Sequence, residues 1–200
     1  MATESAAKAR QEEYLLAQVR EAFGRVVYSH KTHEKQADIC FRRYRWQQGV
    51  LVAFTAVSTG TFLASVLGTL GNQVVTSLAT SFIALVVSAL SLASKSFKFS
   101  EESEAHRRVA SRLWDVRESY MSLITDLMSG ATVPADARAR RDELQEATRA
   151  AYADAPRTTS KAYGRAQDGL KINEELTFTS HEIDLFLPET LRLNEDESGR

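Results

Sequence analysis

Residues 46–94 contain no Lys, Arg, Asp, Glu or His, in a chain of which 26% of the residues are charged. A helix needs about 20 apolar residues to cross the roughly 30 Å hydrocarbon core of a bilayer. This uncharged stretch of 49 residues is therefore long enough for two crossings and a tight turn. We predict a transmembrane helical hairpin at 49–95, with spans near 50–70 and 74–94 and a Gly-Asn-Gln turn at 71–73.

Basic residues flank this hairpin on both sides. Arg42, Arg43 and Arg45 precede the first span, Lys95 and Lys98 follow the second, and the turn between the spans carries no charge. Lys and Arg are enriched in cytoplasmic loops, so both termini are expected in the cytoplasm. The first residues lack the features of a signal peptide, and the first span is expected to serve as the insertion signal.

The rest of the chain is polar, and its size limits what it can do. Outside the hairpin, about 150 residues remain, which is small for a large catalytic core. We expect an all-α membrane protein in which short cytosolic parts surround the hairpin. The predicted segments are a cytosolic N-terminal helix at 1–48, a cytosolic amphipathic helix at 96–130, a C-terminal helical segment at 131–193 and a frayed tail at 194–200.

Heptad spacing on both sides of the hairpin predicts that it continues into the cytosol as antiparallel coiled-coil arms. The two seams include Phe23, Val26, His30 and His33 before the hairpin, and Val109, Leu113, Val116 and Tyr120 after it. A hairpin folded at Asn72 pairs residue i with residue 144 − i, because both arms rise equally per residue. This register places His106 opposite Asp38, and Arg42 and Arg43 opposite Glu102 and Glu101.

The C-terminal third has signals for several short helices. Asp136 is a candidate N-cap for a helix that ends near Tyr152, and Thr158 or Thr159 is a candidate cap for the next helix. Thr179 is followed three residues later by Glu182, which is the spacing of a capping box. Pro188 ends the last predicted helix.

Hydroxyl side chains form a row on each predicted span. A helix turns every 3.6 residues, so each row covers one face. Such rows can line a weakly selective pore without burying a charge, although Ser and Thr in membrane helices also bond to their own backbone or to a neighbouring helix. The pore-lining candidates are Thr55, Ser58, Thr61, Ser65 and Thr69 in the first span, and Ser77, Thr80, Ser81, Ser88 and Ser91 in the second. Two helices cannot enclose a lumen, so a pore requires an oligomer.

Small residues recur every fourth position in the first span. Ala56, Gly60, Ala64 and Gly68 form a small-xxx-small pattern, which lets helix backbones approach closely. We predict a helix-packing role for this face. The contact lies either within the hairpin or between subunits, and the sequence leaves both options open.

No pattern for catalysis or cofactor binding stands out. His30 and His33 are about one helical turn apart and would bind a metal only if a carboxylate or His106 joined them. The predicted register does not bring His106 to this pair. We therefore predict no metal site. The chain has no Gly-rich phosphate loop and no Ser/His/Asp pattern, so we expect neither an enzyme nor a cofactor. The Arg42–Arg45 cluster adjoins a span and is expected to contact anionic lipid rather than nucleic acid.

Two sets of residues resemble a known family. They are Leu113-Trp114-x-x-Arg117-x-x-Tyr120 and a C-terminal set of Ala155-Pro156-Arg157-Thr158, Ala162-Tyr163-x-x-Ala166, and Glu174 to Pro188. Together with the two-span hairpin between polar helices, they resemble the SLATT-domain family, the SMODS and SLOG-associating two-transmembrane effector proteins of bacterial conflict systems.

The resemblance implies a membrane-embedded antiviral effector that oligomerises and permeabilises the bacterial inner membrane when a partner or ligand triggers it. It also implies a partner encoded by a neighbouring gene, either a nucleotide second-messenger synthetase or a reverse transcriptase. An alternative is a non-conducting membrane scaffold or sensor that localises a signalling partner. A further alternative is a soluble helical bundle that hides the hairpin until it is triggered.

Overall fold

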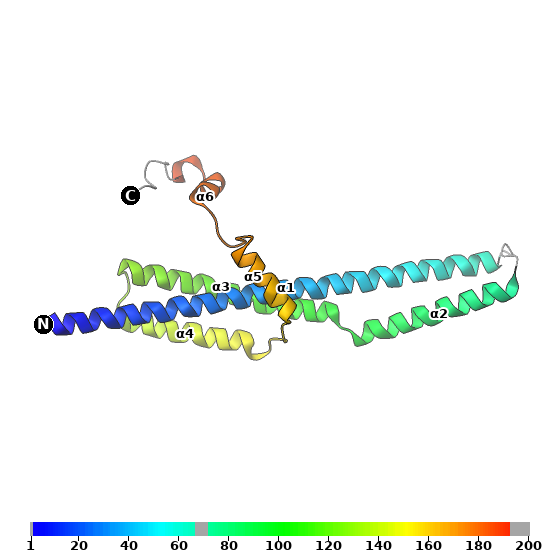
Figure 1. Cartoon of the computed structure of the whole chain (residues 1–200), viewed down its shortest axis with the longest axis horizontal. Helices are drawn as coiled ribbons and strands as arrows, with labels where there is room; N and C mark the ends of the chain where they lie inside the picture. The colour runs from blue at the N-terminus through cyan, green and yellow to red at the C-terminus, as the bar shows by residue number, and fades with distance from the viewer. Residues whose placement is uncertain (1, 67–71, 193–200) are drawn as a thin grey trace.

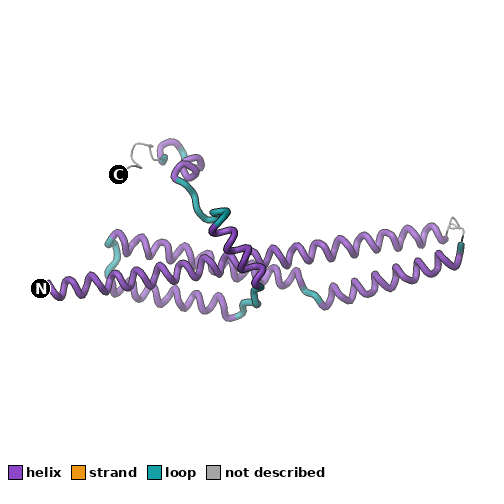
Figure 2. Tube along the Cα trace, in the orientation of Figure 1, coloured by secondary structure: helices purple, strands orange, loops and turns teal. Residues whose placement is uncertain are grey.

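The computed structural model describes residues 2–66 and 72–192, and these residues form helices and loops without a strand (Figure 2). The all-α prediction is confirmed for this part of the chain. The helices are α1 (Ala2–Val66), α2 (Gln73–Ser96), α3 (Phe99–Ser129), α4 (Pro134–Ala153), α5 (Ser160–Lys171) and α6 (Ser180–Phe186), followed by a short 3-10 helix, η1 (Glu189–Leu191).

The molecule is elongated, and α1 is its axis (Figure 1). Helices α3 and α4 lie along the N-terminal half of α1, and α2 lies along its C-terminal half. Helix α5 packs across the middle of α1, whereas α6 stands apart and buries none of its residues. We call the packed part of α1 with α3 and α4 the bundle half, and residues 49–66 of α1 with α2 the apolar half.

Helix α1 runs without a break for 65 residues. All three prolines of the chain lie after α3, so none interrupts this helix. The polar N-terminal segment and the first apolar segment are therefore one continuous rod through the boundary at residue 48.

The hydrophobic core lies in the bundle half, between α1, α3 and α4. Helix α1 contributes one row of buried residues, α3 contributes a second, and three positions of α4 close the cluster. The buried members are Leu15, Val19, Ala22, Val26, Val109, Leu113, Val116, Tyr120, Leu123, Ala137, Leu144 and Ala151. Phe23 is half-buried against this cluster, so the heptad positions predicted from spacing lie mostly inside it.

The predicted register between α1, on one side of the turn, and α3, on the other, is wrong by about one helical turn. His106 lies against His33, with their Nδ1 atoms 2.9 Å apart, and the Ser103 hydroxyl donates to the Ala37 carbonyl at 2.9 Å. The predicted partners of Glu101 and Glu102 are replaced as well, because Glu101 pairs with Lys98 and Glu102 accepts a hydrogen bond from Cys40.

Two features of the chain shift the register, and the first lies between α2 and α3. Phe97 leaves the helical region, with φ −99° and ψ 95°, and the next helix begins at Phe99. An extended residue advances the chain by about 3.3 Å and a helical residue by only 1.5 Å. The extended Phe97 therefore replaces only about one helical residue. The larger part of the shift follows from the described helix ends, because Val66 of α1 and Gln73 of α2 are centred between positions 69 and 70 rather than on Asn72.

Side chains cap several helix starts. Asn72 accepts from the backbone N–H groups of Val74 and Val75, and Thr159 accepts from that of Ala162. Both halves of the Thr179–Glu182 capping box are present, so that prediction is confirmed.

The expected cap at Asp136 is wrong. Helix α4 begins at Pro134, and Asp136 lies in its first turn. The proline ring fixes φ at a helical value and needs no hydrogen-bond donor, so Pro134 suits the first helical position. Before it, Gly130 ends α3 in the left-handed region, at φ 70°, a conformation that glycine adopts without strain.

Candidate functional site

The apolar half places large hydrophobic side chains on its surface. The exposed residues include Val52, Val57 and Phe62 of α1, and Val74, Val75, Leu78, Phe82, Leu85 and Leu92 of α2. Within the described residues, the stretch Val74–Ser129, which covers α2 and α3, contains a window of 18 residues that is apolar enough to cross a membrane. That window falls in α2, because α3 is rich in charged residues. The end of the first predicted span reaches residues 67–71, which lie outside the described residues.

Basic and aromatic side chains meet where the apolar half joins the bundle half. The Arg43 guanidinium lies 5.8 Å from the ring centroid of Phe99, and the Phe97 and Phe99 rings stack with centroids 5.6 Å apart. Trp46 is largely exposed nearby in the sequence. The basic segment before the first apolar stretch thus lies beside the segment that follows the second.

Hydroxyl groups in the apolar half bond to their own helices. The Thr55 hydroxyl donates to the Leu51 carbonyl at 2.8 Å, Ser77 donates to Val74 at 3.0 Å, and Thr80 donates to Thr76 at 2.7 Å. Each hydroxyl oxygen keeps acceptor capacity after it donates.

Seven pore-lining candidates remain, and the structure describes the side chains of four of them. Ser81 and Ser88 are exposed, and Ser58 and Ser91 are half-buried. Thr69 lies outside the described residues, as do the side chains of Thr61 and Ser65. Ser81 and Ser88, both on α2, are therefore two further candidates whose hydroxyls the structure places at the surface.

The small-residue face of α1 is uncovered where the structure describes it. Ala56 and Gly60 are exposed, and a Cβ built on Gly60 meets no described atom within 4 Å. Gly68 and the side chain of Ala64 lie outside the described residues. Within the described part of this chain, no helix packs closely on Gly60.

Three histidines lie between α1 and α3 in the bundle half. His30 Nδ1 is 3.0 Å from the Ala110 carbonyl oxygen, and the His33 and His106 rings face each other through their Nδ1 atoms. Burial, together with the charges of His106 and His30, lowers the pKa of His33 to about 4. Burial also lowers the pKa of His106, so both imidazoles are neutral at pH 7.

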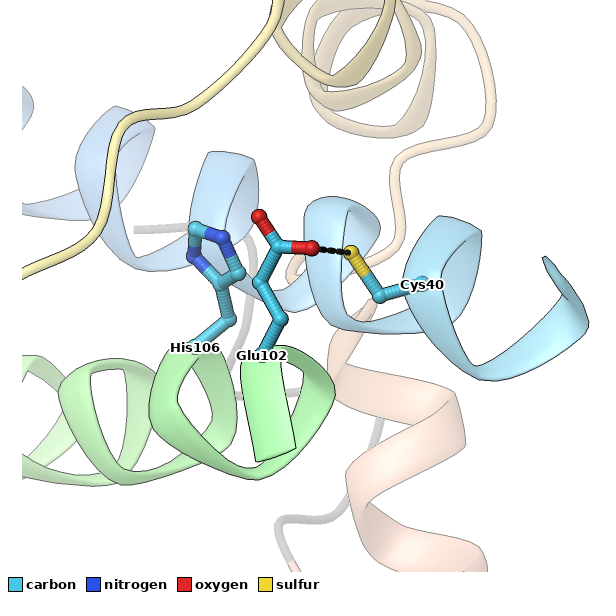
Figure 3. A group of neighbouring side chains, drawn as sticks. All are labelled: Cys40, Glu102 and His106. Atoms are coloured by element: carbon cyan, nitrogen blue, oxygen red, sulfur yellow. Dashed lines mark hydrogen bonds between the residues drawn. The ribbon is translucent and has the colours of Figure 1, made fainter. Parts of the chain in front are cut away.

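Next to these histidines, α1 and α3 bring a thiol, a carboxylate and an imidazole together (Figure 3). The Cys40 Sγ atom is 3.7 Å from Glu102 Oε2, and His106 follows Glu102 one turn along α3. One potential ligand atom from each residue lies within 4.8 Å of the other two. Burial, with the nearby charge of Glu102, raises the pKa of the Cys40 thiol. We call Cys40, Glu102 and His106 the thiol cluster.

A second polar contact ties the segment after α5 to α1. The Glu175 carboxylate lies 2.7 Å from Lys31 Nζ through one oxygen and 2.7 Å from Lys35 Nζ through the other. Hydrogen bonds from Lys31 and then Lys35 lower the pKa of Glu175 to about 2. Burial opposes the charged form of Lys31, but hydrogen bonds to Glu175 and Glu34 outweigh it, and the pKa of Lys31 is raised.

Close packing of α5 on α1 positions this ion pair. Ala162 and Ala166 are fully buried, and the Tyr163 ring stacks near Tyr28 with centroids 6.0 Å apart. A Cβ at Gly169 would lie 3.0 Å from the Glu175 carboxylate, so glycine leaves the room that the carboxylate occupies.

Sequence reasoning did not join Cys40 to Glu102 and His106. One signal was available, because Glu102 and His106 are four residues apart and share a helix face. The missing information was the register between α1 and α3. The pairing of Lys31 and Lys35 with Glu175 has no periodic signal, since the partners are 140 or more residues apart.

Comparison with known proteins gives one match. A family model described as SMODS and SLOG-associating 2TM effector domain family 4 matches residues 15–182. Neither a curated protein nor a solved structure matches the chain. The matched range includes the bundle half, the apolar half and α5.

Proposed function

We propose that this chain, which belongs to the SMODS and SLOG-associating 2TM effector domain family, assembles into oligomers that permeabilise a bacterial inner membrane. Family membership implies a two-transmembrane effector of bacterial conflict systems. The step beyond the family is the mechanism: copies of the apolar half assemble in the bilayer, and the hydroxyl rows line the resulting conduit.

The single observation that carries this proposal is that the apolar half exposes large hydrophobic side chains instead of burying them. Side chains such as Phe62, Phe82 and Leu85 are exposed although each gains free energy on leaving water. Large exposed apolar surfaces mark membrane or protein contacts. A bilayer satisfies both helices at once, since all their backbone hydrogen bonds close within each helix.

The basic and aromatic groups around Arg43 and Phe99 support a topology with both termini in the cytoplasm. Arg and Lys favour the cytoplasmic side of inner-membrane proteins, and aromatic rings favour the headgroup layer. Because Arg43 lies against Phe99, the two flanks are expected at one membrane surface. In this proposal the chain divides into a cytosolic helix at 1–48, the hairpin at 49–95, an amphipathic helix at 96–130, a C-terminal helical segment at 131–193 and a tail at 194–200.

Assembly follows from what one chain cannot do alone. Two helices enclose no lumen, and the uncovered face at Ala56 and Gly60 can receive a helix of another subunit. By the 3.6-residue turn, the hydroxyl row of the first span is centred about 140° around the helix from this face, so contact along the small-residue face leaves the hydroxyl row uncovered. Hydroxyl oxygens that already donate to their own backbone, as at Thr55 and Thr80, still accept hydrogen bonds from water.

The bundle half is proposed to act as coiled-coil arms that control this assembly. The family name implies association with SMODS and SLOG conflict systems. We propose a partner encoded beside this gene, either a nucleotide second-messenger synthetase or a reverse transcriptase. The partner or its product would change how α3, α4 and α5 pack on α1.

The test is dye and ion leakage from liposomes containing the full chain, measured with and without the partner and its product. Leakage that depends on activation supports the proposal. Intact liposomes with an inserted, activated protein would reject conduction and favour the membrane scaffold.

A pair of variants at one pore-lining candidate sharpens this test. Ser88→Glu adds a negative charge to an exposed hydroxyl position of α2, and is expected to increase cation over anion flux. Ser88→Ala, the matched neutral variant, should insert normally and keep the original ion preference. If Ser88→Glu inserts and conducts with unchanged preference, Ser88 does not line the conduit.

A further inference from the structure

We propose that Cys40, Glu102 and His106 form a binding site for one divalent transition-metal ion, with Zn²⁺ the best fit, which clamps α1 to α3 (Figure 3). The site lies at the start of α3, next to the junction with the apolar half. It supplies one sulfur, one oxygen and one nitrogen ligand, and a water would complete four-coordination.

The geometry is close to that of a tetrahedral site. Zn²⁺ binds thiolate sulfur at about 2.3 Å and imidazole nitrogen or carboxylate oxygen at about 2.0–2.2 Å. Ligand atoms around such an ion are separated by roughly 3.3–3.8 Å, as follows from tetrahedral angles and these bond lengths. Here the three candidate atoms lie within 4.8 Å of one another, and Cys40 Sγ is 3.7 Å from Glu102 Oε2. The other two pairs would each have to close by at most about 1.5 Å to reach this range.

The strongest independent observation is an unsatisfied nitrogen. His106 is completely buried, and its Nε2 atom has no hydrogen-bond partner. Its other ring nitrogen, Nδ1, is 2.9 Å from His33 Nδ1. Figure 3 shows one His106 ring nitrogen on the side of the Glu102 carboxylate. A buried polar atom without a partner destabilises the fold, and a metal ion would satisfy it.

The contact with His33 prepares His106 as a ligand. The two Nδ1 atoms are 2.9 Å apart, within hydrogen-bond distance, so one carries the hydrogen and the other accepts it. When His106 donates from Nδ1, its Nε2 holds a free lone pair, as a metal ligand must. Ligand histidines in metalloproteins commonly donate their second ring nitrogen to a neighbouring acceptor in this way.

The charges also balance. Glu102 contributes one negative charge and neutral His106 contributes none. On binding, the Cys40 S–H bond breaks, the S–metal bond forms, and the proton passes to solvent. A divalent ion with one thiolate and one carboxylate then forms a neutral site, which suits a position where Cys40 and His106 are buried.

The experiment uses the full chain in detergent micelles, stripped with a chelator and titrated with Co²⁺ and then Zn²⁺. We expect one Co²⁺ per chain, with a thiolate-to-cobalt charge-transfer band that Zn²⁺ abolishes. Zn²⁺ should also protect Cys40, the only cysteine, from alkylation. Absence of stoichiometric binding in the stripped, folded protein would overturn the proposal.

Three variants locate the site. Cys40→Ser removes the charge-transfer band, and Glu102→Gln, at an exposed position that leaves the core intact, weakens Zn²⁺ binding by about a hundredfold or more. The matched control is His181→Ala, which removes an exposed histidine in α6 and should bind as the unmodified chain does. If Glu102→Gln binds with unchanged affinity, or if His181→Ala loses binding to the same extent, the ion does not occupy this site.

Discussion

The two halves of α1 arrange their apolar residues in opposite ways. In the bundle half, Val19 and Val26 are buried and the surface is charged, whereas in the apolar half Val52 and Phe62 are exposed and residues 49–66 carry no charge. One end of the helix therefore buries its apolar side chains, as expected in water, and the other end exposes them, as expected in hydrocarbon. The exposed fraction of a side chain therefore does not show by itself whether the surface suits water or lipid. The type of residue that is exposed in each half is needed as well.

The largest expected effect comes from a charge placed in the middle of α2. Leu85 and Tyr14 are almost equally exposed, at 68% and 67%, but lie in different halves. Leu85→Lys should oppose insertion by about 3 to 4 kcal/mol, because lysine is unfavourable at the centre of a span. Tyr14→Lys should leave insertion unchanged. Carbonate extraction and detergent fractionation measure the difference, and equal behaviour of both variants would remove the distinction between the halves.

A slightly smaller effect is expected in the core of the bundle half. Leu113 is fully buried, and Leu113→Ala should destabilise the bundle by about 3 kcal/mol, through lost burial and the cavity left behind. Leu92→Ala truncates an exposed leucine of α2 and creates no cavity. Denaturant unfolding in micelles, followed by circular dichroism, compares the two. A loss at Leu92 as large as that at Leu113 would show that α2 is packed like the core.

The third effect concerns assembly rather than the single chain. Gly60→Ile adds a side chain where no described atom lies within 4 Å, so the monomer should be unaffected. If the small-residue face joins subunits, association should weaken by about 1 to 2 kcal/mol. Cross-linking in membranes measures this. Phe62→Trp, on the opposite face of α1, is the steric control, and a similar loss there would argue against a specific interface.

The smallest effect is the pH dependence of the ion pairs at Glu175. The pKa of this carboxyl in the folded chain, about 2, is below its ordinary value of 4.5. The folded state thus binds fewer protons, and the pairing with Lys31 and Lys35 stabilises fully above pH 4.5 and is lost as pH falls toward 2.

Glu175→Gln should cost about 1 kcal/mol at neutral pH, since the pairs are partly exposed. Thermal melts from pH 6 to pH 2.5 should show the difference between this variant and the unmodified chain shrinking as pH falls. The neighbouring Glu174→Gln is the matched control and should show no such convergence.

Sequence periodicity predicted the features of the fold that are set within a single helix, by residues close together in the sequence. The heptad positions Val26, Leu113 and Tyr120 lie in the core because 3,4 spacing places them on one face. The Thr179–Glu182 capping box was predictable for the same reason, since both partners are local.

Contacts between limbs could not be predicted as well. The register depends on where the helices end at the turn and on the break between α2 and α3. Neither the described helix ends at Val66 and Gln73 nor the extended geometry of Phe97 has a clear sequence signal. That error moved His106 away from His33 and concealed the thiol cluster. The hydroxyl rows and the small-residue face, as parts of a conduit or interface, stay predictions because they depend on other copies of the chain.

The unbroken course of α1 has a mechanical consequence. At 65 residues the helix is about 98 Å long, and it joins the bundle half to the apolar half as a single stiff lever. The other limb has a joint at residues 97–98. A movement of α1 at its N-terminal end would therefore be carried to the opposite end along one unbroken helix, whereas the other limb is interrupted at residues 97–98.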